Sequence, residues 1–502
     1  MKRIPIIFLL FIAALTGCQG PGQGKVTILH TNDMHCQYIP LTATWVDSDP
    51  QPKVGGMVAL EYFMRQEKAK WPNSLALDAG DFMTGTPLAK MDVNGATGGA
   101  FVQMINMVGY DAMTIGNHEF DNGQENLHKL LNMLNLDIVS SNLFVNGKPF
   151  VDKPYMIYKV NGVRIGVIGI MLKELFEMTA LKNLDGIEVK DPVATAQKYI
   201  DEIDPKTDLI ILLTHNGVDN DMELANQVHN ADIIIGGHSH TRLPKPRKAN
   251  NVLICQAGSY TRNLGRLTVD VQGDSVAGFD YELINTWADS VKDPNPELKA
   301  LVDKYQSEID SEYNRELATI KTAWISNSSS ESNLGDFITD AMRKESGADF
   351  ALMNSGGIRK DLPAGPVTKL NIVEILPFQN IVETFPCTGE QVLQLIKRNA
   401  NDSEGYHGIL QVSGLAYTYR VKPDKSIEII SATIGGQPID PARTYTGASV
   451  DFILDGQTEK YFGFNPDTTI STGAVISDMI MNYLQKNPVI DSKLEGRMQR
   501  VH

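Results

Sequence analysis

A chain of 502 residues is too long to fold around one ordinary hydrophobic core, so its length predicts at least two domains. Hydrophobic residues make up 42% of the chain and charged residues 21%, as in globular proteins. The formal charge of −15 excludes nucleic-acid polymers and anionic lipid surfaces as the main electrostatic partners. An anionic substrate would therefore need local cations to attract it.

The N-terminus has the pattern of a secretory signal. Lys2 and Arg3 precede an apolar run over residues 4–15, and the run ends in Leu15, Thr16, Gly17 and Cys18. This ending resembles a bacterial lipobox, which implies removal of residues 1–17, a lipid on Cys18 and a flexible tether over residues 18–25. The alternative is an ordinary secreted protein. The apolar run is too short to span a bilayer.

The other cysteines, Cys36, Cys255 and Cys387, are far apart in the sequence and form no CxxC pair. Three cysteines allow at most one internal disulfide, so the pattern excludes a disulfide framework. Cys36 follows His35 and could join a site for a soft metal. Neighbouring residues on a strand point to opposite faces, however, so we favour a packing role for Cys36.

From residue 26 onward, short apolar runs alternate with segments of helical spacing. The runs predict strands at 26–32, 74–77, 112–115, 137–140, 164–170, 208–214, 232–235, 252–256 and 266–271. Helical spacing occurs over residues 56–70, 99–108, 124–134 and 192–203. Several of the strands are almost wholly apolar, which is typical of strands covered on both faces. We therefore expect a layered α/β domain over residues 26–290.

A polar stretch separates this domain from the rest of the chain. Apolar residues recur at helical spacing after the prolines at 294 and 296, which predicts a linker helix within residues 291–320. A second domain of mixed α+β type then covers residues 321–502, with a helix over 333–345 and a β-run over 410–419.

A strand-to-helix turn at residues 115–121 carries the most informative side chains of the chain. Asn117 and His118 lie next to each other there, and Asp121 follows three residues later. An Asn oxygen can bind a hard cation, and a His can donate a proton or a hydrogen bond. A nearby carboxylate can orient the imidazole. The turn therefore predicts the centre of a metal-dependent site.

Other predicted strands of the first domain also end in polar side chains, namely Asp33 and His35, Asp81, His215, and His238 and His240. Taken singly, such motifs are often surface or capping residues. In an open α/β sheet, however, the carboxyl ends of neighbouring strands meet at one crevice. Seven ligands of mixed carboxylate, amide and imidazole type suit two bridged divalent cations, which could be Zn, Mn, Co or Fe. The lack of Cys in the set disfavours a closed structural zinc site.

The motifs DMH (33–35), GDF (80–82), GNHEFD (116–121), TH (214–215) and GGHSH (236–240) resemble those of the calcineurin-like metallophosphatases. ESNLGD (331–336), NSGGIR (354–359), PFQN (377–380) and QVSG (411–414) resemble the branch that carries a C-terminal 5′-nucleotidase domain, which includes the bacterial 5′-nucleotidases and UDP-sugar hydrolases. The resemblance implies a four-layer α/β/β/α sandwich followed by a mixed α+β domain.

The same resemblance implies roles for individual residues. One metal ion would be held by Asp33, His35, Asp81 and His240, and the other by Asp81, Asn117, His215 and His238, with Asp81 bridging. His118 and Asp121 would form the catalytic pair, and a metal-activated water would attack phosphorus. Asn354 and Arg359 would bind the substrate, while Phe378 and Phe452 would clamp a base. For Phe378 alone, core packing is an equal alternative.

Two departures from the family pattern affect substrate choice. Many relatives have an Arg shortly before ESNLG, where this chain has Ser328, Ser329 and Ser330. The usual Gly-Gly-Asp-Gly-aromatic run after the second clamp residue is missing, and residues 453–461 read ILDGQTEKY. One phosphate-binding cation and one carboxylate on the nucleoside side are therefore in doubt.

We expect a lipid-anchored, extracytoplasmic phosphoesterase, in the periplasm or on the cell surface, that acts on small phosphoesters. The leading substrates are nucleoside 5′-monophosphates, and UDP-sugars are further candidates. Within the family, the alternatives are a 2′,3′-cyclic-nucleotide phosphodiesterase with 3′-nucleotidase activity and a sugar-phosphate phosphatase. From another class, the alternative is a non-catalytic nucleotide-binding lipoprotein. The only membrane contact would be through Cys18, and the sequence does not predict an oligomeric state.

Overall fold

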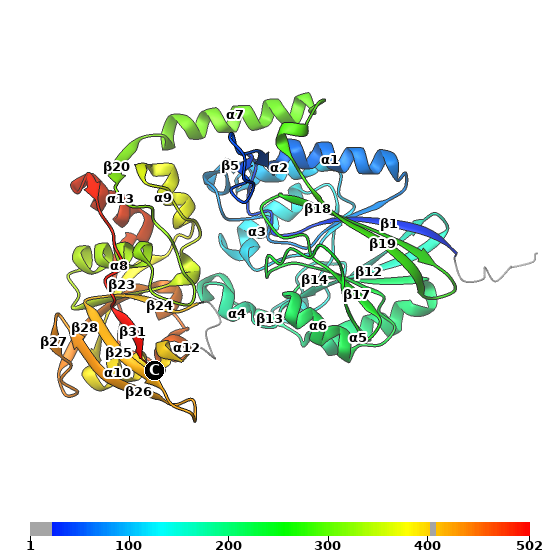
Figure 1. Cartoon of the computed structure of the whole chain (residues 1–502). Helices are drawn as coiled ribbons and strands as arrows, with labels where there is room; N and C mark the ends of the chain where they lie inside the picture. The colour runs from blue at the N-terminus through cyan, green and yellow to red at the C-terminus, as the bar shows by residue number, and fades with distance from the viewer. Residues whose placement is uncertain (1–22, 402–407, 502) are drawn as a thin grey trace, which may run out of the picture.

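The structure is a computed structural model that describes residues 23–401 and 408–501. The predicted signal and Cys18 lie outside the described residues. Figure 1 shows two lobes with helix α7 (Pro296–Tyr313) running along the top of the molecule between them. Asn295 caps this helix, because its side-chain oxygen accepts hydrogen bonds from the backbone N–H groups of Glu297 and Leu298.

The first lobe contains two six-stranded sheets. In the first sheet, four neighbouring strands run parallel: β1 (Gly24–Thr31), β4 (Leu75–Asp78), β7 (Ala112–Met113) and β8 (Asp137–Ile138). β18 (Asn263–Val271) and β19 (Val276–Asn285) extend the sheet in antiparallel fashion. The second sheet has a parallel centre formed by β12 (Val163–Met171), β14 (Leu209–His215), β15 (Ile233–Gly236) and β17 (Val252–Cys255). Its edges are β11 (Tyr155–Val160) and β16 (Arg247–Ala249).

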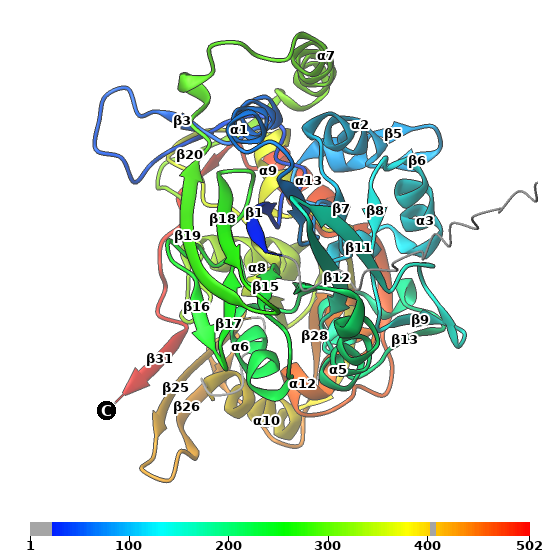
Figure 2. The same cartoon turned by 90° about the vertical axis from the view of Figure 1, so that its right-hand side faces the viewer.

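The two sheets pack face to face through buried aliphatic side chains, which include Ile28, Leu77, Val167 and Ile211. Helices α1 (Met57–Lys70) and α2 (Gly99–Val108) cover the outer face of the first sheet, and α5 (Pro192–Ile203) and α6 (Val218–Gln227) cover the second. Figure 2 shows these helix pairs on opposite sides of the sheets. The four-layer α/β/β/α arrangement predicted for this domain is confirmed.

The second lobe is a mixed α+β domain, also as predicted. Its central sheet has the order β24 (Leu410–Ser413), β21 (Phe350–Asn354), β28 (Thr444–Val450), β23 (Ile381–Thr388) and β29 (Ile470–Val475). Helices α8 (Asn333–Ser346), α10 (Gly389–Ala400) and α13 (Ile476–Lys486) pack against it. The hydroxyl of Ser332 caps α8 by accepting a hydrogen bond from the N–H of Gly335.

The linker prediction was wrong at its C-terminal end. Helix α7 stops at Tyr313, and residues 316–320, which the sequence pattern assigns to the linker, form strand β20 (Glu316–Ile320). β20 pairs with β22 (Gly365–Thr368) and β30 (Val489–Ile490), so these residues belong to the second lobe. The apolar residues at helical spacing end at Tyr313, and the five residues of β20 are too few to give a clear strand pattern of their own.

Cys36, Cys255 and Cys387 are free and buried. Cys36 belongs to the core beneath α1 and α2, and burial raises the pKa of its thiol, which agrees with the packing role that we favoured. Within residues 23–401 and 408–501, no helix is both long enough and apolar enough to cross a membrane.

Candidate metal centre and adjoining cavity

The polar side chains of the sequence motifs meet where the parallel strands end. Asp33 and His35 follow β1, Asp81 follows β4, Asn117 follows β7, His215 ends β14, and His238 and His240 follow β15. Five of these seven residues have φ in the left-handed region: 52° at Asp33, 48° at His35, 58° at Asp81, 79° at His238 and 52° at His240. Asp and His tolerate this region better than most residues, and strained backbones of this kind cluster at functional sites.

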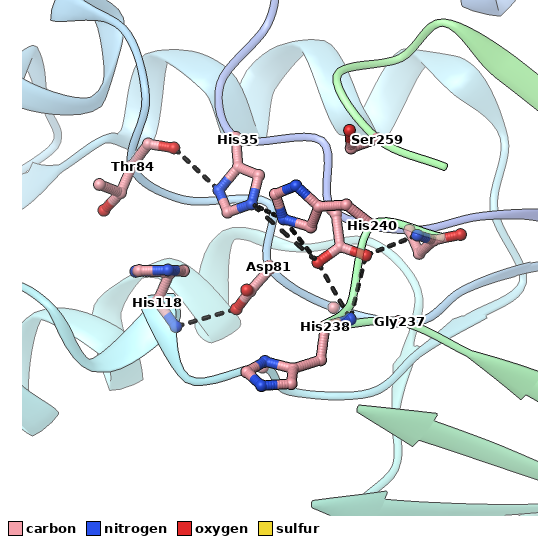
Figure 3. A network of polar contacts seen from close by, with 12 residues as sticks. His35, Asp81, Thr84, His118, Gly237, His238, His240 and Ser259 are labelled. Carbon is pink, nitrogen blue, oxygen red and sulfur yellow. Dashed lines mark hydrogen bonds and ion pairs between the residues drawn. The ribbon is translucent and has the colours of Figure 1, made fainter. Parts of the chain in front are cut away.

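One group of ligand atoms is formed by Asp33, His35 and His240. Nε2 of His35 lies 2.9 Å from Nε2 of His240, and Oδ1 of Asp33 lies 3.4 Å from the latter atom (Figure 3). Nδ1 of His35 lies 3.1 Å from the carbonyl oxygens of both Met83 and Thr84, so Nδ1 carries the proton and Nε2 keeps its lone pair. Burial lowers the pKa of His35 to about 3, which keeps the ring neutral. A cation fits this convergence of electron-rich atoms.

A second group is formed by Asp81, His215 and His238. Nδ1 of His215 lies 2.7 Å from the carbonyl oxygen of Ala79, while its buried Nε2 lies 3.1 Å from Oδ2 of Asp81 without hydrogen-bond geometry. Oδ1 of Asn117 lies 2.9 Å from Nδ1 of His238. A buried nitrogen that lacks a hydrogen bond is costly unless another partner binds it, and a metal ion would be such a partner.

Asp81 lies between the two groups. It also forms a third group of candidate ligands with His35 and His118. Burial opposes ionisation of Asp81, but the charges of His215 and His118 outweigh it and hold the pKa of Asp81 well below its usual range. An ionised carboxylate in this position suits the bridging role that the family pattern implies.

His118 and Asp121 form a hydrogen-bonded pair beside the metal ligands. Nδ1 of His118 lies 2.8 Å from Oδ2 of Asp121, and this oxygen also accepts a hydrogen bond of 2.5 Å from the hydroxyl of Thr84. The backbone N–H of His118 donates to Oδ1 of Asp81 over 2.9 Å (Figure 3). Burial disfavours the imidazolium, yet Asp121 and Asp81 raise the pKa of His118 above its usual value. The prediction for this pair missed Thr84.

Glu119 and Gly116 fix the position of Asp81, a role that the sequence did not reveal. Oε2 of Glu119 accepts hydrogen bonds from the backbone N–H groups of Asp81 and Gly116, over 2.9 and 2.6 Å, and Oε1 accepts one from Met83. A side chain at position 116 would place its Cβ only 2.2 Å from Oδ1 of Asp81. Glycine is therefore required there to leave room for the carboxylate.

A cavity of about 530 Å³ opens in front of the metal ligands. Asp81, Asn117, His118, His238 and His240 line it from the first lobe. All four substrate-binding residues predicted from the sequence line it from the second lobe, namely Asn354, Arg359, Phe378 and Phe452. The structure thus brings the predicted catalytic and substrate-binding residues to one cavity.

The predicted base clamp has a more specific arrangement than the sequence suggested. The ring of Phe378 stacks on the imidazole of His118, with centroids 5.6 Å apart and planes inclined by 21°. The guanidinium of Arg359 lies 6.0 Å from the centroid of the Phe378 ring. Phe378 therefore lies at the junction of the two lobes, and the alternative of simple core packing does not describe it.

One of the two segments that depart from the family pattern borders the same cavity. Ser328 lines it, in the stretch where many relatives have an Arg. Two lysines that the sequence did not single out, Lys90 and Lys182, also line it. Nζ of Lys182 donates to Oδ2 of Asp451 over 2.9 Å, next to Phe452. Cations are therefore present around the cavity even though the Arg is missing.

Comparison with family models agrees with the two lobes and the N-terminal motif. Residues 26–242 match the model described as "Calcineurin-like phosphoesterase". Residues 316–464 match "5'-nucleotidase, C-terminal domain". Residues 1–19 match "Prokaryotic membrane lipoprotein lipid attachment site". The two domain models together match most of the chain.

Individual relatives are similar over nearly the whole chain. Identity is 28% with the trifunctional nucleotide phosphoesterase protein YfkN of Bacillus subtilis, over 96% of this chain but only 35% of that protein. Identity is 26% with protein UshA of Escherichia coli, over 93% of this chain and 92% of UshA. The crystal structure of a 5′-nucleotidase precursor from Thermus thermophilus superimposes with a TM-score of 0.85 at 27% identity and covers 95% of this chain and 100% of that one. The chain therefore belongs to the 5′-nucleotidase family of phosphoric ester hydrolases, in which a calcineurin-like phosphoesterase domain precedes a 5′-nucleotidase C-terminal domain.

Proposed function

We propose that the protein is a lipid-anchored, extracytoplasmic 5′-nucleotidase that hydrolyses nucleoside 5′-monophosphates to nucleoside and phosphate, with UDP-sugars as further substrates. One observation carries this proposal: the metal-ligand cluster and the residues proposed to bind a nucleoside line a single cavity. A phosphate placed against the cluster would leave its nucleoside facing the second lobe. The name of the trifunctional relative and the 5′-nucleotidase precursor support the same substrate class.

The donor set fits two divalent cations. Asp33, His35, Asp81 and His240 would hold one, and Asp81, Asn117, His215 and His238 the other, because their donor atoms form neighbouring groups that are close enough to bind a cation. Mixed nitrogen and oxygen donors accept Zn, Mn, Co or Fe. When bound, such ions lower the pKa of water and neutralise charge on phosphoryl oxygens.

His118 is the proposed proton donor. Asp121 holds Nδ1 of the ring, so Nε2 is the nitrogen left to face the phosphoester. Its raised pKa favours the protonated form, which can donate to the oxygen that leaves phosphorus. When the P–O bond breaks, the proton on Nε2 passes to the nucleoside oxygen.

The second lobe would bind the leaving group. Arg359 presents a guanidinium that suits a phosphoryl oxygen, and the buried Oδ1 of Asn354 has no hydrogen bond to a described residue. Phe378 and Phe452 offer two aromatic faces for a base. This arrangement favours nucleotides over substrates that lack a planar group.

A substrate panel tests the proposal. The protein, begun after Cys18, is incubated with AMP, 3′-AMP, 2′,3′-cyclic AMP, UDP-glucose and a sugar phosphate, with Mn²⁺ or Co²⁺ and with a chelator. We expect AMP to be the best substrate and the chelator to abolish turnover. Preference for the cyclic or sugar substrate would reject the proposed specificity. Turnover that persists in chelator would reject the metal mechanism, and no turnover at all would support a binding lipoprotein.

The anchor is tested separately. Fractionation of cells that express the full chain should place the protein with the membranes, and a Cys18→Ser variant should lose both the incorporated fatty acid and the membrane association. A variant that remains membrane-bound would show that the lipid is not the anchor.

A further inference from the structure

A second, smaller cavity shares part of its wall with the larger one. Its volume is about 170 Å³, and its walls include His35 and Arg262. His118, Tyr260, Arg359 and Phe378 line both this cavity and the larger one. The second cavity therefore borders the metal ligands but is too small to hold a nucleoside beside them.

Arg262 is held rigidly in this cavity. Its Nε donates to the carbonyl oxygen of Ser259 over 3.1 Å, and Nη2 donates to the Ser259 hydroxyl over 3.0 Å. The guanidinium lies 5.4 Å from the ring centroid of Tyr260 and 5.9 Å from that of Trp45. Stacking and these two bonds leave three of its five N–H groups for a ligand.

Tyr260 links this arginine to the metal cluster. Its ring centroid lies 5.5 Å from that of His35 and 5.6 Å from that of His240. Ser259, which accepts both hydrogen bonds from Arg262, directly precedes Tyr260 in the chain. A group bound by Arg262 would consequently lie next to a phosphorus held at the cluster.

The charge of the cavity is not balanced by the protein. Neither Arg262 nor Arg359 forms an ion pair with any carboxylate in the described part of the chain, although the protein carries a formal charge of −15. Among the described residues that line the cavity, the one acid is Glu374, which accepts a hydrogen bond of 2.7 Å from Lys360. Two half-buried guanidinium groups thus face a small space with no anion of their own.

We propose that this second cavity binds a tetrahedral oxyanion of the phosphate class, held by Arg262 and Arg359. Planar guanidinium groups match phosphate oxygens in pairs, and the volume suits one phosphoryl group. The oxyanion comes either from the terminal phosphoryl group of a nucleoside diphosphate or from the inorganic phosphate that hydrolysis releases. The position of the reacting phosphorus beside the cavity rests on the proposed function.

Two measurements on the metal-loaded protein test the inference and separate the two sources. The first is the ratio of kcat/KM for ADP to kcat/KM for AMP, in the native protein and in Arg262→Ala. The second is the Kd for inorganic phosphate, measured by titration calorimetry. Loss of a charge-assisted hydrogen bond is expected to lower the ratio, or to raise the Kd, about tenfold.

A fall in the ratio alone assigns the cavity to the substrate's terminal phosphoryl group. A higher Kd alone assigns it to inorganic phosphate. If both values stay within about twofold of the native protein, the inference is wrong. Should the native protein hydrolyse no nucleotide, the proposed function fails, and the calorimetric measurement still tests the cavity.

Matched variants guard against a general loss of structure. Arg262→Gln keeps most of the side chain for stacking and should give the same result as Arg262→Ala, with an unchanged melting temperature. Arg242 is an exposed arginine that lines neither cavity. Arg242→Ala should therefore change neither the ratio nor the Kd. Equal effects of Arg242→Ala and Arg262→Ala would assign the change to overall charge and overturn the proposed site.

Discussion

Nδ1 of the His118 imidazole is hydrogen-bonded to Asp121. The contribution of this ring to catalysis should be measurable separately from its contribution to folding. We expect His118→Asn to lower kcat/KM for AMP by about 10² or more, because a group that donates a proton in the transition state typically contributes that much. Steady-state kinetics and thermal melting measure the two effects. The exposed His229 provides the control, since His229→Asn should leave the rate unchanged. A His118→Asn rate within a few fold of the native rate would contradict the assignment.

Thr84 should act through Asp121 and is thus a positioning residue. Its hydroxyl shares Oδ2 of Asp121 with the His118 ring. We expect Thr84→Val to lower kcat about tenfold with a smaller change in KM, because the carboxylate loses a hydrogen bond that fixes its orientation. Thr84→Ser keeps the hydroxyl and should restore most of kcat. If Val and Ser variants behave alike, the hydroxyl is not what orients Asp121.

The site residues that the sequence predicts are marked by a local pattern, whereas the missed ones are defined by contacts in space. Asp33 and His215 could be predicted because they come directly after apolar strands, whose parallel ends must meet at one edge. Thr84 and Glu119 could not, because their roles depend on which loops come together in space. Thr84 acts on Asp121, 37 positions away, and Glu119 acts on Asp81, 38 positions away, and no local pattern records such pairs.

At the level of single elements, Gly116 in the turn after β7 must leave room for the carboxylate of Asp81, which follows β4. We expect Gly116→Ala to displace Asp81, because the new Cβ would lie 2.2 Å from Oδ1, and bound metal per chain should fall well below that of the native protein. Elemental analysis measures the amount of bound metal per chain. Gly278→Ala, whose Cβ would meet its nearest neighbour at an ordinary 3.6 Å, should keep the metal. Full metal content in Gly116→Ala would contradict the role of Asp81 as a ligand.

Burial explains which elements the sequence could predict. β12 and β14 are covered on both faces, so their apolar runs are continuous and easily recognised. α6 (Val218–Gln227) was missed because its sequence, VDNDMELANQ, is mostly polar and buries few side chains. β19 was not predicted either, because one of its faces is exposed to solvent along most of its length and its sequence carries charged and polar residues. Elements with little buried surface leave a weak periodic signal.

At the scale of the whole molecule, the cavity depends on contacts between the two lobes. Lys460 of the second lobe donates to Oε2 of Glu177 in the first over 2.7 Å, and Lys182 of the first lobe donates to Asp451 in the second over 2.9 Å. The side-chain amide of Gln457 donates to the carbonyl oxygen of Phe176 over 2.7 Å. All three of these contacts use second-lobe residues between 451 and 460, a range that overlaps the segment that departs from the family pattern. That segment thus contributes to holding the lobes together.

Reversing one of these charges should weaken nucleotide binding without affecting the chemistry at the metal ligands. Lys460→Glu places two carboxylates together, and partly exposed pairs of this kind contribute up to about 1 kcal/mol, which corresponds to a KM for AMP about threefold to fivefold higher. p-Nitrophenyl phosphate has no ribose or purine base for the second lobe to bind, so its turnover should fall less than that of AMP. The double variant Lys460→Glu, Glu177→Lys recreates the pair and should restore the KM for AMP. Equal losses for both substrates would instead place the effect at the metal ligands, and failure of the double variant to recover would show that this pair does not align the lobes.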